Sequence, residues 1–245
     1  MGLLTRLLPG TTTVGATAPA HQGRWLPGQC LICHAWPAAA ACEDCRARFI
    51  PELARCQRCA APLASAATPV CGACLREPPP LERCVVAVSY GLPWQSWVSQ
   101  FKFRDDTGLA HPMAALMAAA PGARELLDAA DALVPVPLTP ERLAERGYNQ
   151  ALLLARRLAP RKTRADLLLR AHHTVPQHDL PRAQRLKSLR GAFLVEPLRA
   201  RAVAGRHLLL VDDVVTTGAT LHAAARALLE AGAVWVDALA FAHTD

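Results

Sequence analysis

The sequence predicts an α/β fold, a parallel sheet flanked by helices, preceded by a small module organised by cysteines. Residues 208–211 are apolar without alternation, as in a parallel strand buried on both faces. An apolar helical stripe and a second strand at 234–241 follow, separated by Gly232 as a helix stop. The stripe consists of Leu221, Ala224, Ala225, Leu228 and Leu229. Ligands of such strand–helix–strand units bind at the carboxyl ends of the strands.

An acidic pair and a hydroxyl-rich turn join the first strand to the helix. Asp212 and Asp213 follow the apolar run, and residues 216–220 read Thr-Thr-Gly-Ala-Thr. The first amides of a helix lack partners within it, so this turn suits a phosphate, and its glycine permits close approach. The carboxylates can accept hydrogen bonds from vicinal ribose hydroxyls or hold Mg²⁺ through its water shell. The pattern predicts a sugar-phosphate site; the alternative is a capped helix beside two solvated aspartates.

Eight of the nine cysteines form four CxxC pairs. The pairs are Cys30/Cys33, Cys42/Cys45, Cys56/Cys59 and Cys71/Cys74. Two such pairs complete one tetrahedral thiolate site, so we expect two structural Zn²⁺ ions. Pairing in sequence order is simplest, and interleaved pairing stays open. Four disulfides in a secreted protein are the alternative, although residues 1–9 show no credible signal peptide. Cys84 is expected to be a small buried hydrophobe.

The chain of 245 residues suits one α/β domain plus the module. We expect a flexible leader over 1–29, the cysteine module over 30–80 and the larger domain over 81–245. In that domain we expect strands at 84–90, 132–136 and 166–170, and mostly loop over 171–206. Trp94, Trp97, Val98 and Phe101 lie on one helical stripe and read as a core face. Further helices begin at caps Thr139 and Asn149, the latter ending near Leu158, and His222 is expected at the surface.

Positive charge is concentrated in one part of the chain. The formal net charge is +7, and residues 140–206 contain 15 basic and 5 acidic residues. A pyrophosphate ligand needs cations, a wider basic surface attracts nucleic acid, and a solvated face is the plain alternative. No apolar run approaches the length of a membrane span, and we expect a cytoplasmic protein.

The run Leu-Leu-Leu-Val-Asp-Asp-Val-Val-Thr-Thr-Gly-Ala-Thr at 208–220 resembles the 5-phosphoribosyl-1-pyrophosphate (PRPP) signature of type I phosphoribosyltransferases. The resemblance implies that Asp212 and Asp213 contact the ribose hydroxyls as the catalytic pair. It further implies that the 5-phosphate is bound by the loop containing Val214, Thr216, Thr217, Gly218, Ala219 and Thr220. Mg²⁺ would accompany PRPP.

Together with the cysteine module, three more segments make the chain similar to the ComF family. They are Phe101-Lys102-Phe103-Arg104, Val134-Pro135-Val136-Pro137 and residues 142–150. The resemblance implies that Lys102, Arg142 and Arg146 meet pyrophosphate. It also implies a mobile loop containing Thr174, Gln177, Arg182 and Arg185, where Lys187-Ser188 departs from the family's usual Asn.

This resemblance implies a PRPP-binding, phosphoribosyltransferase-like protein acting in natural competence. Its partners would be PRPP, single-stranded DNA and a DNA-uptake helicase. Two alternatives stay open. One is a nucleic-acid-binding module that keeps the fold without catalysis, and the other is a nucleobase salvage enzyme of nucleoside metabolism. No acceptor-recognition segment is evident in the sequence.

Overall fold

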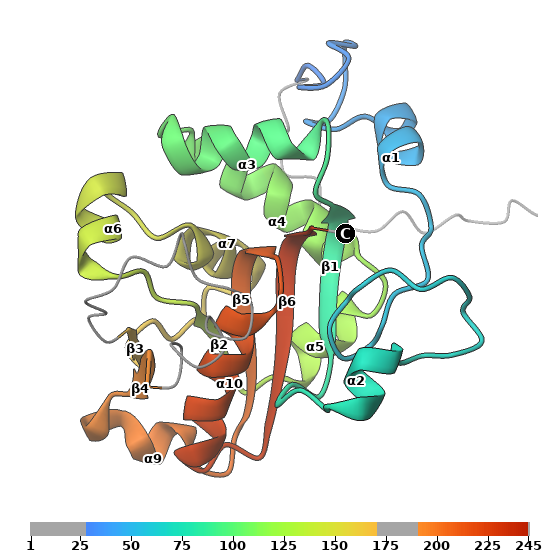
Figure 1. Cartoon of the computed structure of the whole chain (residues 1–245). Helices are drawn as coiled ribbons and strands as arrows, with labels where there is room; N and C mark the ends of the chain where they lie inside the picture. The colour runs from blue at the N-terminus through green and yellow to red at the C-terminus, as the bar shows by residue number, and fades with distance from the viewer. Residues whose placement is uncertain (1–27, 171–190, 245) are drawn as a thin grey trace, which may run out of the picture.

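The computed structural model describes residues 28–170 and 191–244, in which a four-stranded parallel sheet forms the centre (Figure 1). The strand order is β1 (Cys84–Ser89), β6 (Trp235–His243), β5 (His207–Val215) and β2 (Ala132–Pro135). The buried runs of β2, β5 and β6 are nearly continuous, as expected where helices cover both faces. The α/β class is therefore confirmed.

One face of the sheet is covered by the helices that follow β1 and β2. These are α3 (Trp94–Phe103), α4 (Ala110–Ala119), α5 (Ala123–Ala129) and α7 (Gln150–Leu158), with the short η1 (Thr107–Leu109) before α4. Trp94, Trp97 and Phe101 are all buried here, so the prediction of a core stripe is confirmed. Helix α6 (Pro140–Arg146) precedes α7 and lies at the edge of this layer (Figure 1).

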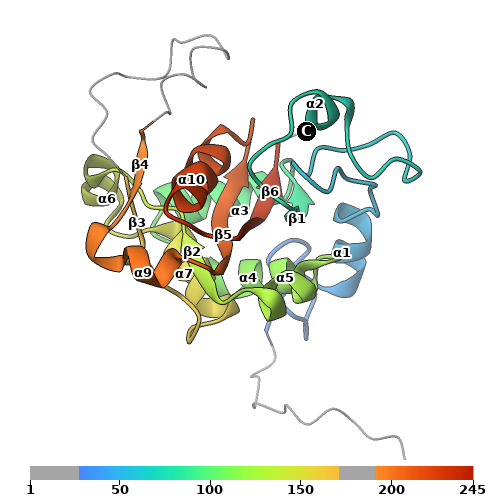
Figure 2. The same cartoon turned by 90° about the horizontal axis from the view of Figure 1, so that it is seen from below.

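The other face packs against α10 (Ala219–Glu230) and a small hairpin. The hairpin consists of β3 (Leu168–Arg170) and antiparallel β4 (Phe193–Val195). Seen from below, α10 lies on one side of the sheet and α4, α5 and α7 lie on the other (Figure 2). The predicted core stripe of α10 is buried at Leu221, Ala224, Ala225 and Leu228.

Two expectations differ from the structure. The prediction of loop is wrong for residues 191–206, which include β4, η3 (Pro197–Arg199) and α9 (Ala200–Val203). These elements are three or four residues long, too short to show a periodic pattern, and they form because Phe193 and Val203 are buried in the core. Strand β5 also continues through the acidic pair to Val215, because its partner β6 extends equally far.

The cysteine module packs on both layers. Its first part contains α1 (Glu43–Phe49), and the indole nitrogen of Trp94 donates to the Phe49 carbonyl at 2.9 Å. Its second part contains α2 (Gly72–Arg76), and the amide of Cys84 donates to the Gln57 carbonyl at 2.7 Å. Cys84 is buried as predicted. In the part of the chain that the structure describes, no helix is long and apolar enough to cross a membrane.

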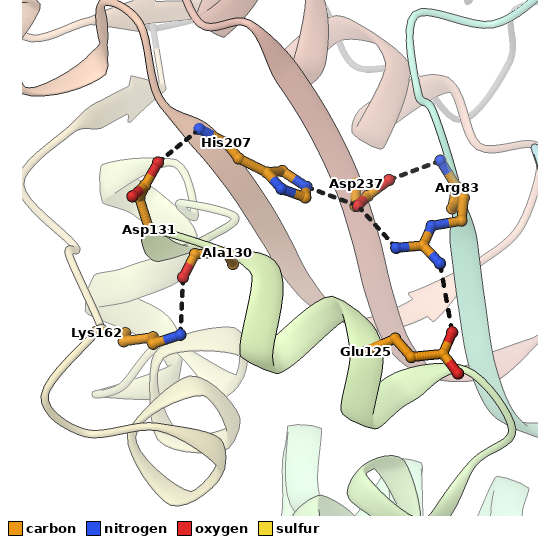
Figure 3. Close-up of polar contacts among 7 residues, drawn as sticks. All are labelled: Arg83, Glu125, Ala130, Asp131, Lys162, His207 and Asp237. Atoms are coloured by element: carbon orange, nitrogen blue, oxygen red, sulfur yellow. Dashed lines mark hydrogen bonds and ion pairs between the residues drawn. The ribbon is translucent and has the colours of Figure 1, made fainter.

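A polar network closes the amino-terminal edge of the sheet, away from the acidic pair (Figure 3). Asp237 is almost fully buried and accepts from the Arg83 amide at 2.8 Å, while its other oxygen lies 2.7 Å from His207 Nε2. Lys162 Nζ donates to the carbonyls of Leu127, Asp128 and Ala130 at the end of α5. These groups satisfy buried polar atoms and the unpaired carbonyls of a helix end, so we assign this edge to stability.

Candidate sugar-phosphate site and cysteine clusters

Strand β2 ends beside Val211 of β5, because the pair is parallel and Pro135 aligns with Val211. Asp212 and Asp213 lie just beyond this point on β5. Successive side chains of a strand alternate in direction, so the two carboxylates meet different neighbours at the same edge of the sheet. Asp213 belongs to the side covered by α3 and α7, and Asp212 belongs to the side of α10 and the hairpin.

Lys102 and Asp213 form the closest ion pair at this edge. Lys102 Nζ, from the last turn of α3, lies 2.9 Å from Asp213 Oδ1. Asp213 is only 6% exposed, so the charge of Lys102 is what makes a buried carboxylate tolerable. The structure thus unites two predicted site residues that are 111 positions apart in the chain.

Asp212 has a different electrostatic environment. Burial, and then the neighbouring Asp213 carboxylate, raise the pKa of Asp212 to about 7, and Lys102 opposes the shift. One Asp212 oxygen accepts from the backbone amide of Asp213 at 2.9 Å. Two adjacent carboxylates that resist simultaneous ionisation attract any cation that can neutralise them, and Mg²⁺ prefers such oxygen ligands.

Arg170 belongs to this site and was missed from the sequence. It lies at the end of β3, its guanidinium is 5.1 Å from the centre of the Phe193 ring, and Nη1 donates to the Pro137 carbonyl at 3.5 Å. Burial, and then Arg142, lower the pKa of Arg170, while Asp212 raises it. The hairpin brings Arg170 to the edge where β5 ends, and no local sequence signal could reveal that placement.

The turn between β5 and α10 is where the sequence predicts phosphate binding. Gly218 adopts φ of +73°, which favours glycine, and the Ala219 amide is 3.4 Å from Thr217 Oγ1. Thr216 and Thr217 are exposed. The amides at the start of this 12-residue helix therefore face an accessible turn with hydroxyl donors beside it.

His222 corrects the expectation of a surface position. Its ring packs under the turn, so that a Cβ on Gly218 would lie 3.0 Å from His222 Nε2. That nitrogen is buried and has no hydrogen-bond partner among the described residues. Burial, and then Arg226, lower the pKa of His222, which favours the neutral ring. The helical periodicity placed His222 next to the core stripe and not within it. The ring nitrogen is nevertheless buried, because the turn at Gly218 lies over it.

The segment after β2 follows its sequence signals closely. Thr139 Oγ1 accepts from the Arg142 amide at 3.3 Å and caps α6, and Asn149 Oδ1 accepts from the Leu152 amide at 3.2 Å and caps α7. Asn149 Nδ2 donates to the Val136 carbonyl at 3.0 Å, and the Tyr148 hydroxyl donates to the Phe101 carbonyl. These bonds fix α6 beside the end of α3, and so place Arg142 and Arg146 at this edge.

Eight of the nine cysteines form two groups of four, paired in sequence order. The first cluster is Cys30, Cys33, Cys42 and Cys45; the second cluster is Cys56, Cys59, Cys71 and Cys74. Within each, the sulfur atoms lie within 4.8 Å of one another. Cys33 and Cys42 sulfurs are 3.6 Å apart and Cys59 and Cys71 sulfurs 3.8 Å, too long for disulfides of about 2 Å. Four thiolates around a tetrahedral metal are separated by about 3.8 Å, so the residues present fit an ion.

The surroundings of the sulfurs also suit a metal. Burial would raise the pKa of Cys30, but amide hydrogen bonds from Cys33 and Cys42 outweigh it and lower this pKa to about 6. Amides around Cys56 likewise lower its pKa to about 7. Burial and neighbouring sulfurs raise the pKa of Cys45 and of Cys74. These shifts run in opposite directions within one cluster, and a bound metal is what could stabilise four thiolates together.

Comparison with known proteins agrees with this geometry. Residues 144–242 match the phosphoribosyl transferase domain family. The chain is 34% identical over 234 residues to the DNA utilization protein YhgH of Salmonella typhimurium, covering 89% of this chain and 98% of that protein. It is 31% identical over 199 residues to competence protein F of Haemophilus influenzae, covering 78% and 85%. The chain belongs to the ComF family. It is also 36% identical over 135 residues to competence protein ComFC of Bacillus subtilis, covering 55% and 53%.

The domain match and the site coincide only in part for this ComF protein. The matched range contains Arg146, Arg170, the acidic pair and the turn predicted to bind phosphate. It excludes Lys102, Arg142 and both cysteine clusters. Thr174, Gln177, Arg182 and Arg185, the proposed mobile loop, lie outside the described residues.

Proposed function

We propose that this ComF protein binds PRPP with Mg²⁺ at the carboxyl end of β5. The observation that carries the proposal is the continuous arrangement of the acidic pair, the Gly218 turn and the open amides of α10. The amides and the hydroxyls of Thr216, Thr217 and Thr220 would bind the 5-phosphate, and Asp212 and Asp213 would orient the ribose diol. Mg²⁺ would supply charge neutralisation between the carboxylates and pyrophosphate.

The pyrophosphate end of the ligand would face the cations beside α6. Lys102, Arg142 and Arg146 are the residues proposed for it, and we add Arg170 because it lies near Arg142 and Asp212. In phosphoribosyl transfer a nucleophile forms a bond to ribose C1 as the bond to pyrophosphate breaks, and the departing oxygen carries the electron pair. Cations placed around that oxygen stabilise the developing charge.

Titration calorimetry with PRPP, with and without Mg²⁺, tests the proposal. We expect one ligand per chain, and we expect the double variant Asp212→Ala/Asp213→Ala to lose binding. Asp128→Ala is the matched control, because this exposed carboxylate lies on α5 at the opposite edge. The proposal is wrong if the wild-type titration gives no heat of binding, or if the double variant binds PRPP as tightly as wild type.

We further propose that both cysteine clusters hold Zn²⁺ as a structural ion. Sulfur-only ligand sets of four favour this ion, and each cluster joins segments too short to build a core of their own. X-ray absorption at the zinc edge and metal quantification should give two equivalents with sulfur coordination. Another metal at the edge, or iron–sulfur absorption bands, would contradict the assignment.

A second function is favoured by the relatives and by charge. The names of the relatives refer to DNA utilization and competence, and residues 140–206 have a net charge of +10. We propose that the protein handles single-stranded DNA in the cytoplasm. Binding of a fluorescent oligonucleotide should weaken steeply as salt rises, because counterions compete for the phosphates. Affinity that is insensitive to salt would count against it.

A further inference from the structure

One aromatic side chain of α3 differs from the rest. Trp94, Trp97 and Phe101 are buried in the core, whereas Phe103 is 66% exposed at the carboxyl end of the helix. It directly follows Lys102, whose ammonium group contacts Asp213 at 2.9 Å. The exposed ring therefore stands at the rim of the proposed sugar-phosphate site.

A guanidinium group holds this ring from one side. The Cζ atom of Arg146 lies 5.1 Å from the centre of the Phe103 ring, within the range of a cation–π contact. Arg146 Nη1 in turn donates to Gln150 Oε1 at 3.3 Å, and Gln150 is only 2% exposed. The ring is thus supported by an arginine that α6 and α7 fix in place, and its exposed part is open to a second planar group.

The support also has an unused donor. Arg146 Nε is buried without a hydrogen-bond partner among the described residues. A buried polar atom left unpaired is costly, which indicates that packing, and not solvent, holds this guanidinium beside the ring.

The position of the ring along the site decides what it can contact. The 5-phosphate is proposed at the start of α10, and the ribose diol at the acidic pair. The opposite end of the ligand, ribose C1, then points toward α6 and the end of α3, where Arg146 and Phe103 meet. The group attached to, or attacking, C1 of a nucleotide is a nucleobase, and nucleobases stack on aromatic faces.

We infer that Phe103, backed by Arg146, is the stacking platform for an unpaired nucleobase at the C1 end of the site. The inference rests on the proposed function and adds the class of ligand that the acceptor end takes. The base can come from a free nucleotide or nucleobase, or from a single strand that crosses the rim. Stacking chemistry is the same for both sources.

Paired ligands separate this inference from the proposed function. Ribose 5-phosphate tests the phosphate loop and the acidic pair alone, while AMP adds a base to the same phosphate and diol. We expect AMP to bind wild type more tightly than ribose 5-phosphate, and Phe103→Ala to remove about 10-fold of AMP affinity while leaving ribose 5-phosphate affinity unchanged. If ribose 5-phosphate fails to bind, the proposed function fails. If it binds but AMP affinity ignores Phe103→Ala, the platform is overturned.

Three controls sharpen the result. Phe103→Tyr keeps an aromatic face and should retain AMP affinity, whereas Phe103→Leu keeps apolar bulk and should not. Leu198→Ala removes an apolar side chain that is 91% exposed, so it controls for nonspecific surface effects. Thermal unfolding of Phe103→Ala should match wild type, since the ring is not part of the core.

An oligonucleotide arm identifies the source of the base. If Phe103→Ala weakens binding of single-stranded DNA as well as AMP, the platform serves a strand. If AMP alone is affected, it serves a free nucleotide or acceptor base. Both results support stacking, and AMP affinity that is unchanged in Phe103→Ala refutes it whatever happens to the oligonucleotide.

Discussion

Replacing Asp212 by asparagine should stabilise the unliganded protein, and increasingly so at higher pH. The carboxyl pKa is raised from 3.8 to about 7 by burial and by Asp213. The folded state therefore holds a proton that the unfolded state has released between these values, so the wild-type free energy of unfolding falls as pH rises through that window. Asparagine has no proton to lose, and its Oδ1 can still accept from the Asp213 amide.

The magnitude follows from the same values. Each pH unit between 3.8 and 7 corresponds to about 1.4 kcal/mol, so the advantage of the variant should grow by at most about 3 kcal/mol between pH 5 and pH 8. Solvent around this partly exposed side chain reduces that bound. For a chain of 245 residues, 1 kcal/mol shifts the melting temperature by about 2–4 °C, so differences of several degrees are measurable.

The assay is thermal unfolding of wild type and Asp212→Asn, both loaded with metal at the cysteine clusters. It is run at pH 5, 6, 7 and 8, without Mg²⁺ or sugar phosphate. Ionisation of the cysteines contributes equally to the unfolding of both proteins, so it cancels in the difference between their melting temperatures. Asp166→Asn is a control of opposite sign, because hydrogen bonding from Arg164 lowers the pKa of Asp166 and its loss should destabilise at neutral pH. A difference between wild type and Asp212→Asn that is constant with pH would refute the reasoning. The same variant should lose PRPP affinity, since asparagine lacks the negative charge that the proposed Mg²⁺ contact requires.

Three further outcomes are expected. Gly218→Ala should weaken ribose 5-phosphate binding at least about 10-fold in calorimetry, because its Cβ would lie 3.0 Å from His222 Nε2 at a φ of +73°. Adding His222→Ala should recover part of the lost affinity, and additive losses in the double variant would contradict this explanation. Lys162→Met should lower the free energy of unfolding by about 1–3 kcal/mol in urea titrations, because three carbonyls lose their donor, and an unchanged midpoint would contradict it. Cys45→Ser and Cys74→Ser should each reduce bound zinc from two equivalents to one; loss of both ions in either variant would show that the clusters do not bind metal independently.

Local sequence signals predicted most elements of the larger domain. Apolar runs predicted β2, β5 and β6, periodic stripes predicted α3 and α10, and the caps Thr139 and Asn149 set the starts of α6 and α7. Each signal is contained within one turn or one strand, where burial and capping act on neighbours in the chain. The short β4 and α9 have no such pattern, because only tertiary burial of Phe193 and Val203 stabilises them.

The candidate site divides in the same way. The acidic pair, the Gly218 turn and the cysteine pairs could be predicted because the chemistry that they serve requires specific residue types at close spacing. Arg170 and the exposed Phe103 could not, because each acquires its proposed role from a partner on another element. Arg170 needs the hairpin to bring it near Asp212, and Phe103 needs α6 to bring Arg146 over its ring.

By itself, the sequence predicted a sugar-phosphate site and the two sets of cysteines that could hold a metal, and it predicted where the strand and helix beside that site begin. Only the tertiary structure decided that cysteines pair in chain order, that Lys102 neutralises Asp213 while Asp212 is left with a raised pKa, and that an aromatic ring stands at the rim. The physical reason is range. Periodicity, caps and turns act over a few residues, whereas burial and electrostatic pairing depend on which distant segments the packed core brings together.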